Sequence, residues 1–314
     1  MSLRIGTRGS PLALWQARAV EQAIRAAGGP PCELAVIRTT GDRLATRDLS
    51  AIGGKRLFVK EIEEALLDGG IHLAVHSAKD LPAELPPGLV IGAVLPREDP
   101  HDAVVLPRGS RGEGSGGALL AALGGAPRVG TGSVRRVAQL ARTVPRARFQ
   151  SIRGNVETRL RKLDAGDCDA LVLAAAGLVR LGLGERANAR LTADECLPAP
   201  GQGIVAIEIR ESDERTRSVL DRIDDCAAGV ALAAERALVR ALGGDCRVPI
   251  GALAVQEADG VALDAVVASL DGRRRLRRQA RGPADTAAAL GADLASRMLA
   301  DGAEEILAPH RSPR

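Results

Sequence analysis

Residues 3–27 read LRIGTRGSPLALWQARAVEQAIRAA, and this stretch decides the fold class of the chain. Leu3–Thr7 has the pattern of a strand. Pro11–Ala27 is predicted to be a helix, because Ser10 is a favourable N-cap and proline is favourable at the first helical position. A second strand is expected at Glu33–Thr39. A strand, a helix and a strand in this order indicate an α/β unit with parallel strands.

The alternation continues to about residue 210, with a hinge expected at Pro96–Pro100. Ile204–Arg210 is a late strand that we expect to return to the first lobe. Further strands are predicted at Ile71–His76, Leu89–Val94, Ala103–Leu106, Arg128–Thr131, Arg148–Ile152 and Ala170–Ala174, and further helices at Phe58–Leu67, Val134–Arg142 and Val156–Ala165.

The C-terminal part follows a different pattern, in which strands succeed one another. The elements expected there are a helix at Ala227–Leu242, strands near Ile250–Gln256, Val261–Ser269 and Arg274–Ala280, and a helix at Ala284–Ala300. The sequence therefore predicts two α/β lobes with mainly parallel sheets, plus a small α+β C-terminal domain.

Composition narrows the functional classes. A net charge of +4 over 314 residues is mild, and it suggests attraction to small anions more than a nucleic-acid surface. The five cysteines form no C-x-x-C pair, which favours a reducing compartment over a disulfide framework or a zinc site. The N-terminus has no apolar signal core and no run reaches membrane-spanning length, so we expect a cytoplasmic protein without a membrane partner.

Two glycine-rich motifs do not support nucleotide binding. Gly112, Gly114 and Gly117 match G-x-G-x-x-G, but no acidic residue follows about twenty positions on to bind a ribose. A mobile loop is the better interpretation of this segment. Lys55 follows two glycines but precedes Arg56 instead of serine or threonine, so it does not form a phosphate-binding P-loop.

Basic residues follow several predicted strands at their carboxyl ends, where α/β proteins bind ligands. Three of these ends also open helices, whose free N–H groups favour anions. The set predicts a cleft for an anion with several carboxylates or phosphates, although any single arginine could be simply solvated. The basic residues and the polar or acidic residues beside them are Arg8 and Ser10, then Ser77, Lys79 and Asp80, then Arg135 and Arg136, and finally Arg153 and Arg159.

Other candidates allow two interpretations each. Asp80 could form a structural ion pair, or it could stabilise a cationic intermediate in a dry cleft. Cys246 lies in the loop Gly243–Pro249, where Arg247 would favour a thiolate, but it could be an ordinary loop cysteine. His72 and His76 alternate with apolar residues as in a strand, so no metal site is expected. The basic stretch Arg273–Arg278 is interpreted as a solvated sheet edge.

Several motifs together resemble the hydroxymethylbilane synthase (porphobilinogen deaminase) family. The resemblance runs in family order over nearly the whole chain. It rests on Thr7–Gln16, Gly53–Glu61, Ala74–Pro82, Arg97–Pro100, Gly130–Arg136, Arg153–Val156 with Thr158–Leu160, Pro200–Gly203 and Gly243–Gly251.

The resemblance implies three domains and a monomeric enzyme. Two lobes similar to periplasmic binding proteins would comprise residues 1–99 with 196–214, and 100–195; residues 215–314 would form the α+β domain. Such enzymes join four porphobilinogen molecules, with loss of ammonia, on a dipyrromethane primer that a thioether would attach to Cys246. Asp80 would be the catalytic carboxylate. The residues expected to bind substrate or cofactor carboxylates are Arg8, Ser10, Lys55, Ser77, Lys79, Arg135, Arg136, Arg153, Arg159 and Arg180, and Gln202 would lie at the domain junction.

The implied chemistry suits these residues. Loss of ammonia from porphobilinogen leaves an electron-poor cation that a carboxylate can stabilise, and each addition brings two more carboxylates for arginines to bind. Four positions depart from the family pattern, namely Gly9, Ala51, Arg56 and Gly132. The main alternative is a non-enzymatic anion-binding module, which would leave Cys246 and the third domain unused.

Overall fold

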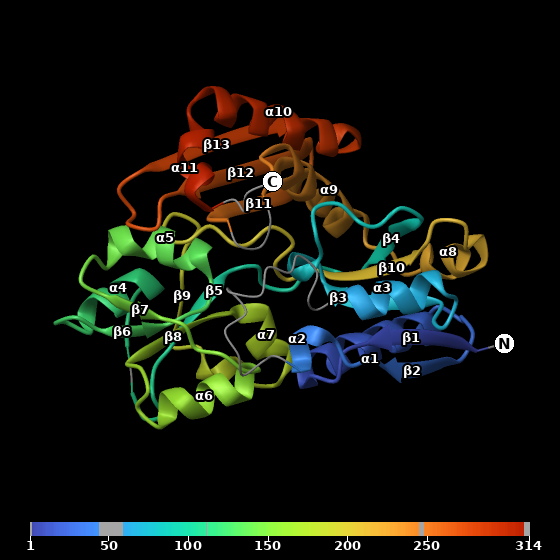
Figure 1. Cartoon of the computed structure of the whole chain (residues 1–314), viewed down its shortest axis with the longest axis horizontal. Coiled ribbons are helices and arrows are strands. Elements are labelled where there is room, and N and C mark those ends of the chain that lie inside the picture. Colours follow the sequence, from blue (N-terminus) through green and yellow to red (C-terminus); the bar gives the residue numbers. More distant parts are fainter. Residues whose placement is uncertain (1, 44–58, 111, 245–247, 311–314) are drawn as a thin grey trace. The chain divides into compact units, whose positions relative to one another are not determined.

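A computed structural model of the chain describes residues 2–43, 59–110, 112–244 and 248–310. The chain divides into two compact units (Figure 1). The first comprises Met1–Arg97 and Ile204–Gly229, and the second comprises Glu98–Gly203 and Val230–Arg314. This division groups residues 196–203 with the second lobe and residues 215–229 with the first. The finer three-domain scheme stays a prediction.

The first unit contains a five-stranded sheet in the order β2-β1-β3-β10-β4. Strand β1 runs parallel to β2 and β3, whereas β10 runs antiparallel to β3 and β4. Only β10 therefore opposes the common strand direction, and the expected return of this segment to the first lobe is confirmed. The strands are β1 (Leu3–Thr7), β2 (Cys32–Val36), β3 (Leu73–Ser77), β4 (Leu89–Val94) and β10 (Val205–Arg210), and the helices are α1 (Pro11–Ala26), α2 (Thr40–Arg43), α3 (Lys60–Leu67) and α8 (Glu214–Leu220).

Helix α1 forms as its sequence predicts. The Ser10 side chain accepts a hydrogen bond from the Ala13 amide, and proline occupies the first turn. Ala17, Val20 and Ile24 then repeat at helical spacing on one buried face, so α1 packs against the sheet. The core that they share with β1, β3 and β10 fixes the ends of these strands relative to α1.

The second unit begins with another five-stranded sheet, in the order β7-β6-β8-β5-β9. Strand β6 runs parallel to β7 and β8, and β5 runs antiparallel to β8 and β9. In each sheet one strand, β10 or β5, runs against the direction that the other strands share. Both sheets are mainly parallel in this sense, as predicted. The strands are β5 (Asp102–Val105), β6 (Arg128–Gly130), β7 (Arg148–Gln150), β8 (Ala170–Ala174) and β9 (Ala189–Arg190), and the helices are α4 (Gly116–Ala122), α5 (Val134–Thr143), α6 (Val156–Asp164) and α7 (Ala175–Arg180).

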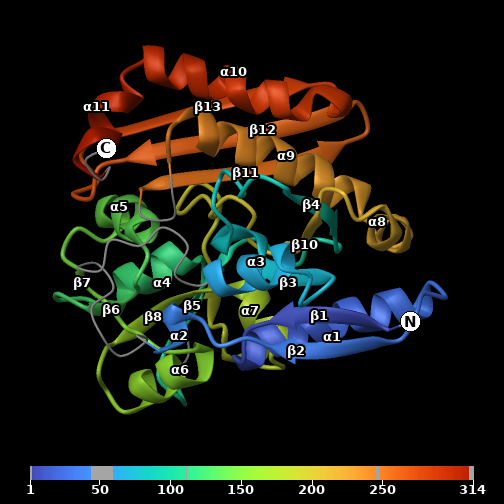
Figure 2. The same cartoon turned by 45° about the vertical axis from the view of Figure 1, so that its right-hand side comes forward.

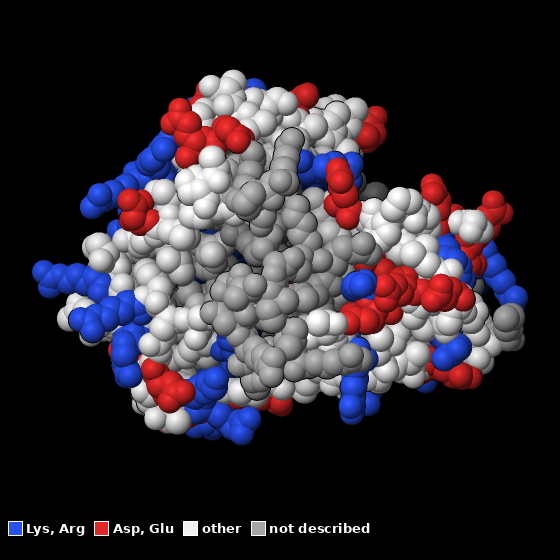
Figure 3. All heavy atoms as spheres, viewed as in Figure 1, with Lys and Arg blue, Asp and Glu red and all other residues white. Residues whose placement is uncertain are grey.

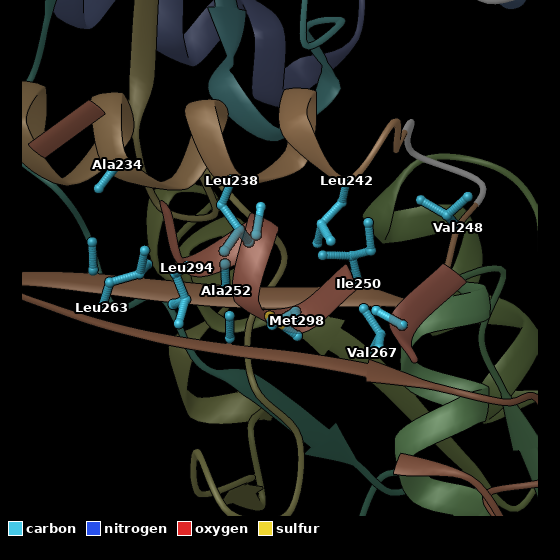
Figure 4. Close-up of a cluster of buried hydrophobic side chains, with 14 of the residues drawn as sticks. Ala234, Leu238, Leu242, Val248, Ile250, Ala252, Leu263, Val267, Leu294 and Met298 are labelled. Carbon is cyan, nitrogen blue, oxygen red and sulfur yellow. The ribbon is translucent and has the colours of Figure 1, made fainter. Parts of the chain in front are cut away.

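The C-terminal part of the second unit is an antiparallel sheet in the order β11-β12-β13 (Figures 1 and 2). A separate hydrophobic core joins it to three helices, with Leu238, Ile250, Leu263 and Met298 among its members (Figure 4). The small α+β domain is therefore as predicted. Its elements are α9 (Cys226–Ala241), β11 (Ile250–Glu257), β12 (Gly260–Ala268), β13 (Arg275–Gly282), α10 (Ala287–Ala300) and α11 (Ala303–Leu307).

The basic stretch near Arg273–Arg278 is an edge strand, as expected, but it is not merely solvated. Arg277 bonds to Asp264 on the neighbouring strand, and Arg278 pairs with Asp301. Acidic and basic side chains also occur together on the visible face of the molecule (Figure 3). The pairs of Arg277 with Asp264 and of Arg278 with Asp301 compensate the positive charge of β13 locally.

The glycine-rich motif of Gly112, Gly114 and Gly117 does not lie wholly in a loop, because its last glycine belongs to helix α4. Helix α4 begins at Gly116, because Ser115 accepts a hydrogen bond from the Ala118 amide and caps it. Within the residues that the structure describes, no helix is both long enough and apolar enough to span a membrane.

Candidate functional site

One group of candidate site residues lies at the carboxyl-end edge of the first sheet. Strands β1 and β3 are parallel neighbours, with Ile5 opposite Leu73, so their carboxyl ends lie at one edge. Arg8 and Ser10 follow β1, while Ser77, Lys79 and Asp80 end or follow β3. The structure thus brings together five of the predicted residues within this unit.

Local hydrogen bonds position this edge. The Gln16 side chain of α1 donates to the Ser77 hydroxyl at 2.8 Å, which ties the end of β3 to α1. Ser10 serves as the N-cap of α1, and its hydroxyl lies 3.3 Å from the Ala13 nitrogen. Asp80 ends a single turn of 3₁₀ helix, Ala78–Asp80, and is exposed. Its carboxylate is therefore accessible to a ligand at this edge.

The two histidines near this edge have different partners. His72 Nδ1 accepts a hydrogen bond from the Arg4 amide at 2.9 Å. His76 is buried, and its Nε2 lies 3.2 Å from a carboxylate oxygen of Glu208, which is also buried. Among the described residues no group of three or more His, Cys, Asp or Glu side chains is placed to hold a metal ion.

A second group of candidate site residues lies at the carboxyl-end edge of the second sheet. Strands β7, β6 and β8 are parallel neighbours, so the segments that follow them lie at one edge. The structure brings five predicted arginines to this edge. Arg135 and Arg136 open α5 after β6, Arg153 and Arg159 follow β7, and Arg180 ends α7 after β8.

Arg135 and Arg136 are buried and share one carboxylate, that of Asp102 at the start of β5. Arg135 Nη2 lies 2.8 Å from Asp102 Oδ2, and Arg136 donates through Nε and Nη2 to Asp102 Oδ1 at 3.1 and 2.8 Å. Arg136 also donates to the Val172 carbonyl, and Arg135 donates to the Leu197 carbonyl. In this structure both guanidinium groups therefore face protein acceptors, and their predicted role as direct ligands of carboxylates stays a prediction.

Two further groups complete this buried cluster. Gln202 Nε2 donates to Asp102 Oδ1 at 2.9 Å, and the Cys196 thiol lies 3.5 Å from Asp102 Oδ2. Burial raises the pKa of Cys196 to about 12, so the thiol stays protonated. Burial alone would raise the pKa of Asp102, but Arg135 and Arg136 hold it well below its usual range. The carboxylate is consequently ionised at neutral pH.

Two of the other three arginines at this edge donate to backbone carbonyls. Arg159 Nε donates to the Gly154 carbonyl at 2.8 Å, and Arg180 Nη2 donates to the Gly203 carbonyl at 2.6 Å. Arg180 is buried, and burial lowers the pKa of its guanidinium. Arg153 and Arg159 are only half-buried, so they are the most accessible arginines of this edge.

The buried cluster fits an acid-bearing group. Two guanidinium charges face one carboxylate, which leaves one positive charge in excess. Arg135 Nε is buried and has no hydrogen-bond acceptor among the described residues. A buried donor without an acceptor costs free energy, and the excess positive charge of the cluster would favour a negatively charged ligand near it.

The remaining predictions fall in two groups. Lys55 and Cys246, together with the departures Ala51 and Arg56, lie outside the described residues. Gly9 and Gly132 are described, and both have space for a side chain. A Cβ atom at Gly9 would meet only Val36 at 3.4 Å, and one at Gly132 would meet only Ser151 at 3.8 Å. Packing therefore does not require glycine at either position.

Sequence reasoning missed Asp102. The one available signal is that Asp102 is the single charged residue of the otherwise apolar stretch Asp102–Leu106. An acid that enters a buried strand needs a partner, but the sequence does not say which residue provides it.

Comparison with known proteins decides the family. The family domain described as "Porphobilinogen deaminase, dipyromethane cofactor binding domain" matches residues 3–218, and "Porphobilinogen deaminase, C-terminal domain" matches residues 230–300. The chain belongs to the porphobilinogen deaminase family. All the described site residues lie within the first match, and Cys246 lies within the second.

Curated family members match over nearly their full length. The porphobilinogen deaminase of Desulforudis audaxviator is 50% identical over 310 residues, covering 98% of this chain and 97% of the relative. That of Syntrophotalea carbinolica is 46% identical over 308 residues, covering 98% and 95%. The family resemblance inferred from the sequence motifs is therefore confirmed.

Likenesses to solved structures outside the family are distant. The VFT2 domain of Bordetella pertussis BvgS has a TM-score of 0.41 and 16% identity, and covers 71% of this chain and 85% of that domain. An ancestral cationic amino acid solute-binding protein has a TM-score of 0.43 and 13% identity, and covers 71% and 88%.

Proposed function

We propose that this protein polymerises four molecules of porphobilinogen into the linear tetrapyrrole hydroxymethylbilane, with release of ammonia. Family membership supports the reaction class. One structural observation supports it further, namely that each of the two lobes carries charged residues suited to this chemistry at one edge of its sheet. The first edge holds an accessible carboxylate, Asp80, and the second holds five arginines.

Asp80 is the proposed catalytic carboxylate. Its exposed position at the end of a short turn allows it to accept a hydrogen bond from a pyrrole N–H. The same charge offsets the positive charge that develops when the aminomethyl group leaves as ammonia. The neighbouring Lys79, together with Arg8 and Ser10 after β1, would bind the acetate and propionate arms of the substrate. Ser77 and Lys55 complete this proposed set.

The arginines of the second edge would bind the carboxylates of the incoming substrate, of the growing chain and of the primer. Arg153 and Arg159 are half-buried and offer guanidinium groups to a ligand. Arg135, Arg136 and Arg180 are buried and would add positive charge near that ligand. The primer, a dipyrromethane attached through Cys246, supplies the free pyrrole carbon on which the chain grows. Its attachment to Cys246 is part of the proposal.

The expected surroundings of the enzyme are also proposals. We expect a cytoplasmic monomer of 32.5 kDa, whose first two domains comprise residues 1–99 with 196–214 and 100–195, and whose third comprises 215–314. Exposed large apolar side chains among the described residues are scattered over different elements, such as Trp15, Val179 and Val255, which suits a monomer. Light scattering after size exclusion measures the oligomeric state.

The decisive experiment is incubation of the purified chain with porphobilinogen. We expect one ammonia per substrate consumed, and one linear tetrapyrrole per four substrates, read by mass spectrometry. Binding of porphobilinogen without ammonia release would instead identify a non-enzymatic anion-binding module and would contradict the proposal.

A further inference from the structure

Asp102 has the most unusual surroundings of any described acid in the second lobe. It is completely buried at the first position of β5, and it accepts hydrogen bonds from two arginines and a glutamine. Its partners come from distant parts of the sequence, with Arg135 and Arg136 on α5 and Gln202 in the segment that precedes β10. One carboxylate therefore joins a strand, a helix and a connecting segment.

The contacts of the two arginines leave them few alternative orientations. Arg136 uses Nε and Nη2 for Asp102 and Nη1 for the Val172 carbonyl. Arg135 uses Nη2 for Asp102 and Nη1 for the Leu197 carbonyl. Because every one of these acceptors is fixed in the backbone or in Asp102, the planar guanidinium groups are fixed too.

Both arginine side chains are almost completely buried. The side chains of Arg135 and Arg136 are 4% and 7% exposed. The acceptors that fix the rotation of each planar group therefore also decide which of its N–H groups are left for a ligand. Asp102 is the acceptor that both arginines share.

We propose that Asp102 is a positioning residue of the deaminase site, which orients Arg135 and Arg136 and leaves one positive charge in excess to attract the carboxylates of the substrate and primer. The proposal rests on the proposed function and deepens it. Asp102 itself does not touch the substrate, and it acts through the two arginines.

The test replaces Asp102 with asparagine, which keeps the size of the side chain and removes its charge. A misoriented guanidinium weakens binding of the ground state and the transition state alike, so KM for porphobilinogen should rise about tenfold or more while kcat changes less. A purely structural role predicts a smaller active fraction, which lowers the apparent kcat and leaves KM at the wild-type value. KM within twofold of wild type would overturn the proposal.

A second variant keeps the test decisive if Asp102→Asn does not fold. Asp102→Glu restores the charge but displaces the carboxylate by one methylene, so KM should rise by roughly threefold and remain below that of the asparagine variant. An Asp102→Glu enzyme with wild-type KM contradicts positioning on its own.

Asp264→Asn is the matched control. Like Asp102, Asp264 is a strand aspartate that accepts hydrogen bonds from an arginine and a glutamine, Arg277 and Gln279, but it belongs to the C-terminal sheet. Its substitution should leave KM unchanged. If the wild type and this control made no tetrapyrrole at all, the proposed function would fail. If both were active and the two Asp102 variants kept wild-type KM, only the positioning role would fail.

A readout independent of turnover uses the primer. After incubation with porphobilinogen, intact mass gives the fraction of chains that carry two extra pyrrole units. We expect this fraction to accumulate several-fold more slowly in Asp102→Asn than in Asp264→Asn, because the same arginines would bind the primer carboxylates. Equal rates of primer accumulation contradict the proposal.

Discussion

The two mixed sheets differ in how exposed the charged residues at their carboxyl-end edges are. At the first edge Asp80 is exposed and Lys79 is half-buried, at the end of β3 and within one short turn. At the second edge Arg135, Arg136 and Arg180 are buried and bonded to Asp102 or to backbone carbonyls. A similar sheet edge thus carries an accessible acid in one lobe and buried, fixed guanidinium groups in the other.

The difference in exposure suits two different functions, catalysis at the first edge and binding of the growing chain at the second. A group that takes part in a bond-making step must reach the reacting atoms, and an exposed carboxylate can. A surface that receives a chain with a growing number of carboxylates needs fixed donors, because rigid guanidinium groups lose little entropy when they bind. The comparison therefore predicts chemistry at the first edge and retention at the second, and substitutions can test the two separately.

The largest effect is expected when the proposed primer, whose carboxylates the arginines of the second edge would bind, cannot be attached. Cys246→Ser should lack the mass of two pyrrole units and form no tetrapyrrole, because a hydroxyl is a much poorer nucleophile than a thiolate. The wild type, after incubation with substrate, should show four titratable thiols in denaturant from its five cysteines.

The same variant should also be less stable, since a cofactor that binds only the folded state stabilises that state. Differential scanning calorimetry of the two proteins measures the difference. Five free thiols and an unmodified mass, in a wild-type protein that still makes tetrapyrrole, would contradict both the primer and its site.

The next largest effect tests the first edge alone. Asp80→Asn should lower kcat by about 100-fold or more, because a charge that stabilises the transition state is lost. The fold should be unaffected, since Asp80 is exposed. Glu84→Gln, which alters another exposed acid of the same loop, is the control and should keep its rate. An Asp80→Asn enzyme within about threefold of the wild-type rate would remove the catalytic role of this edge.

The buried cluster predicts a stability effect at the second edge. Asp102→Asn leaves two buried guanidinium charges without a carboxylate, and breaking a buried ion pair costs about 3–5 kcal/mol. Urea unfolding at neutral pH, compared with Asp264→Asn, measures this loss. A loss no larger than that of the control would show that the cluster contributes little to folding.

The sign of the pH dependence follows from the same cluster. The folded-state pKa of Asp102 lies below the unfolded value of about 3.9, so its stabilisation is present above that pH and is lost as the pH falls further. The difference in unfolding free energy between wild type and Asp102→Asn should therefore shrink below about pH 4. A difference that stays constant down to about pH 3 would mean that Asp102 is not the titrating group.

The smallest effect concerns a departure from the family pattern at the second edge. Gly132→Ser should change unfolding free energy by no more than about 0.5 kcal/mol, because the added side chain meets open space. Gly130→Ser is the matched contrast two residues away. A Cβ there would lie 2.6 Å from Leu171 and 2.7 Å from Ile152, so we expect a loss of about 1–3 kcal/mol. Equal losses would mean that the strand end is not packed as described.

Much of this architecture could be predicted because the determining signals are local. The caps Ser10, Ser133 and Asn155 each accept a hydrogen bond from an amide three residues on, and each marks where a helix follows a strand end. These local signals predicted the strand ends at which Arg8, Arg135 and Arg159 are found. The structure confirms those placements.

Other features depend on distant partners. Asp102 bonds to residues 34 and 100 positions later in the chain, and no local pattern identifies either partner. Helix α7 was missed for another reason. It follows β8 without a break at Ala174, and the apolar run offers neither a turn residue nor a clear change of period.

The insertion of β10 between β3 and β4 has a consequence for synthesis on the ribosome. In this sheet β4 pairs with β10 alone, so residues 89–94 have no strand partner until residues 205–210 have been made. The second sheet, by contrast, takes all its strands from residues 102–190. The lobe that starts first is therefore the one whose sheet closes last, and β4 must wait as an unpaired edge while the whole second lobe is translated.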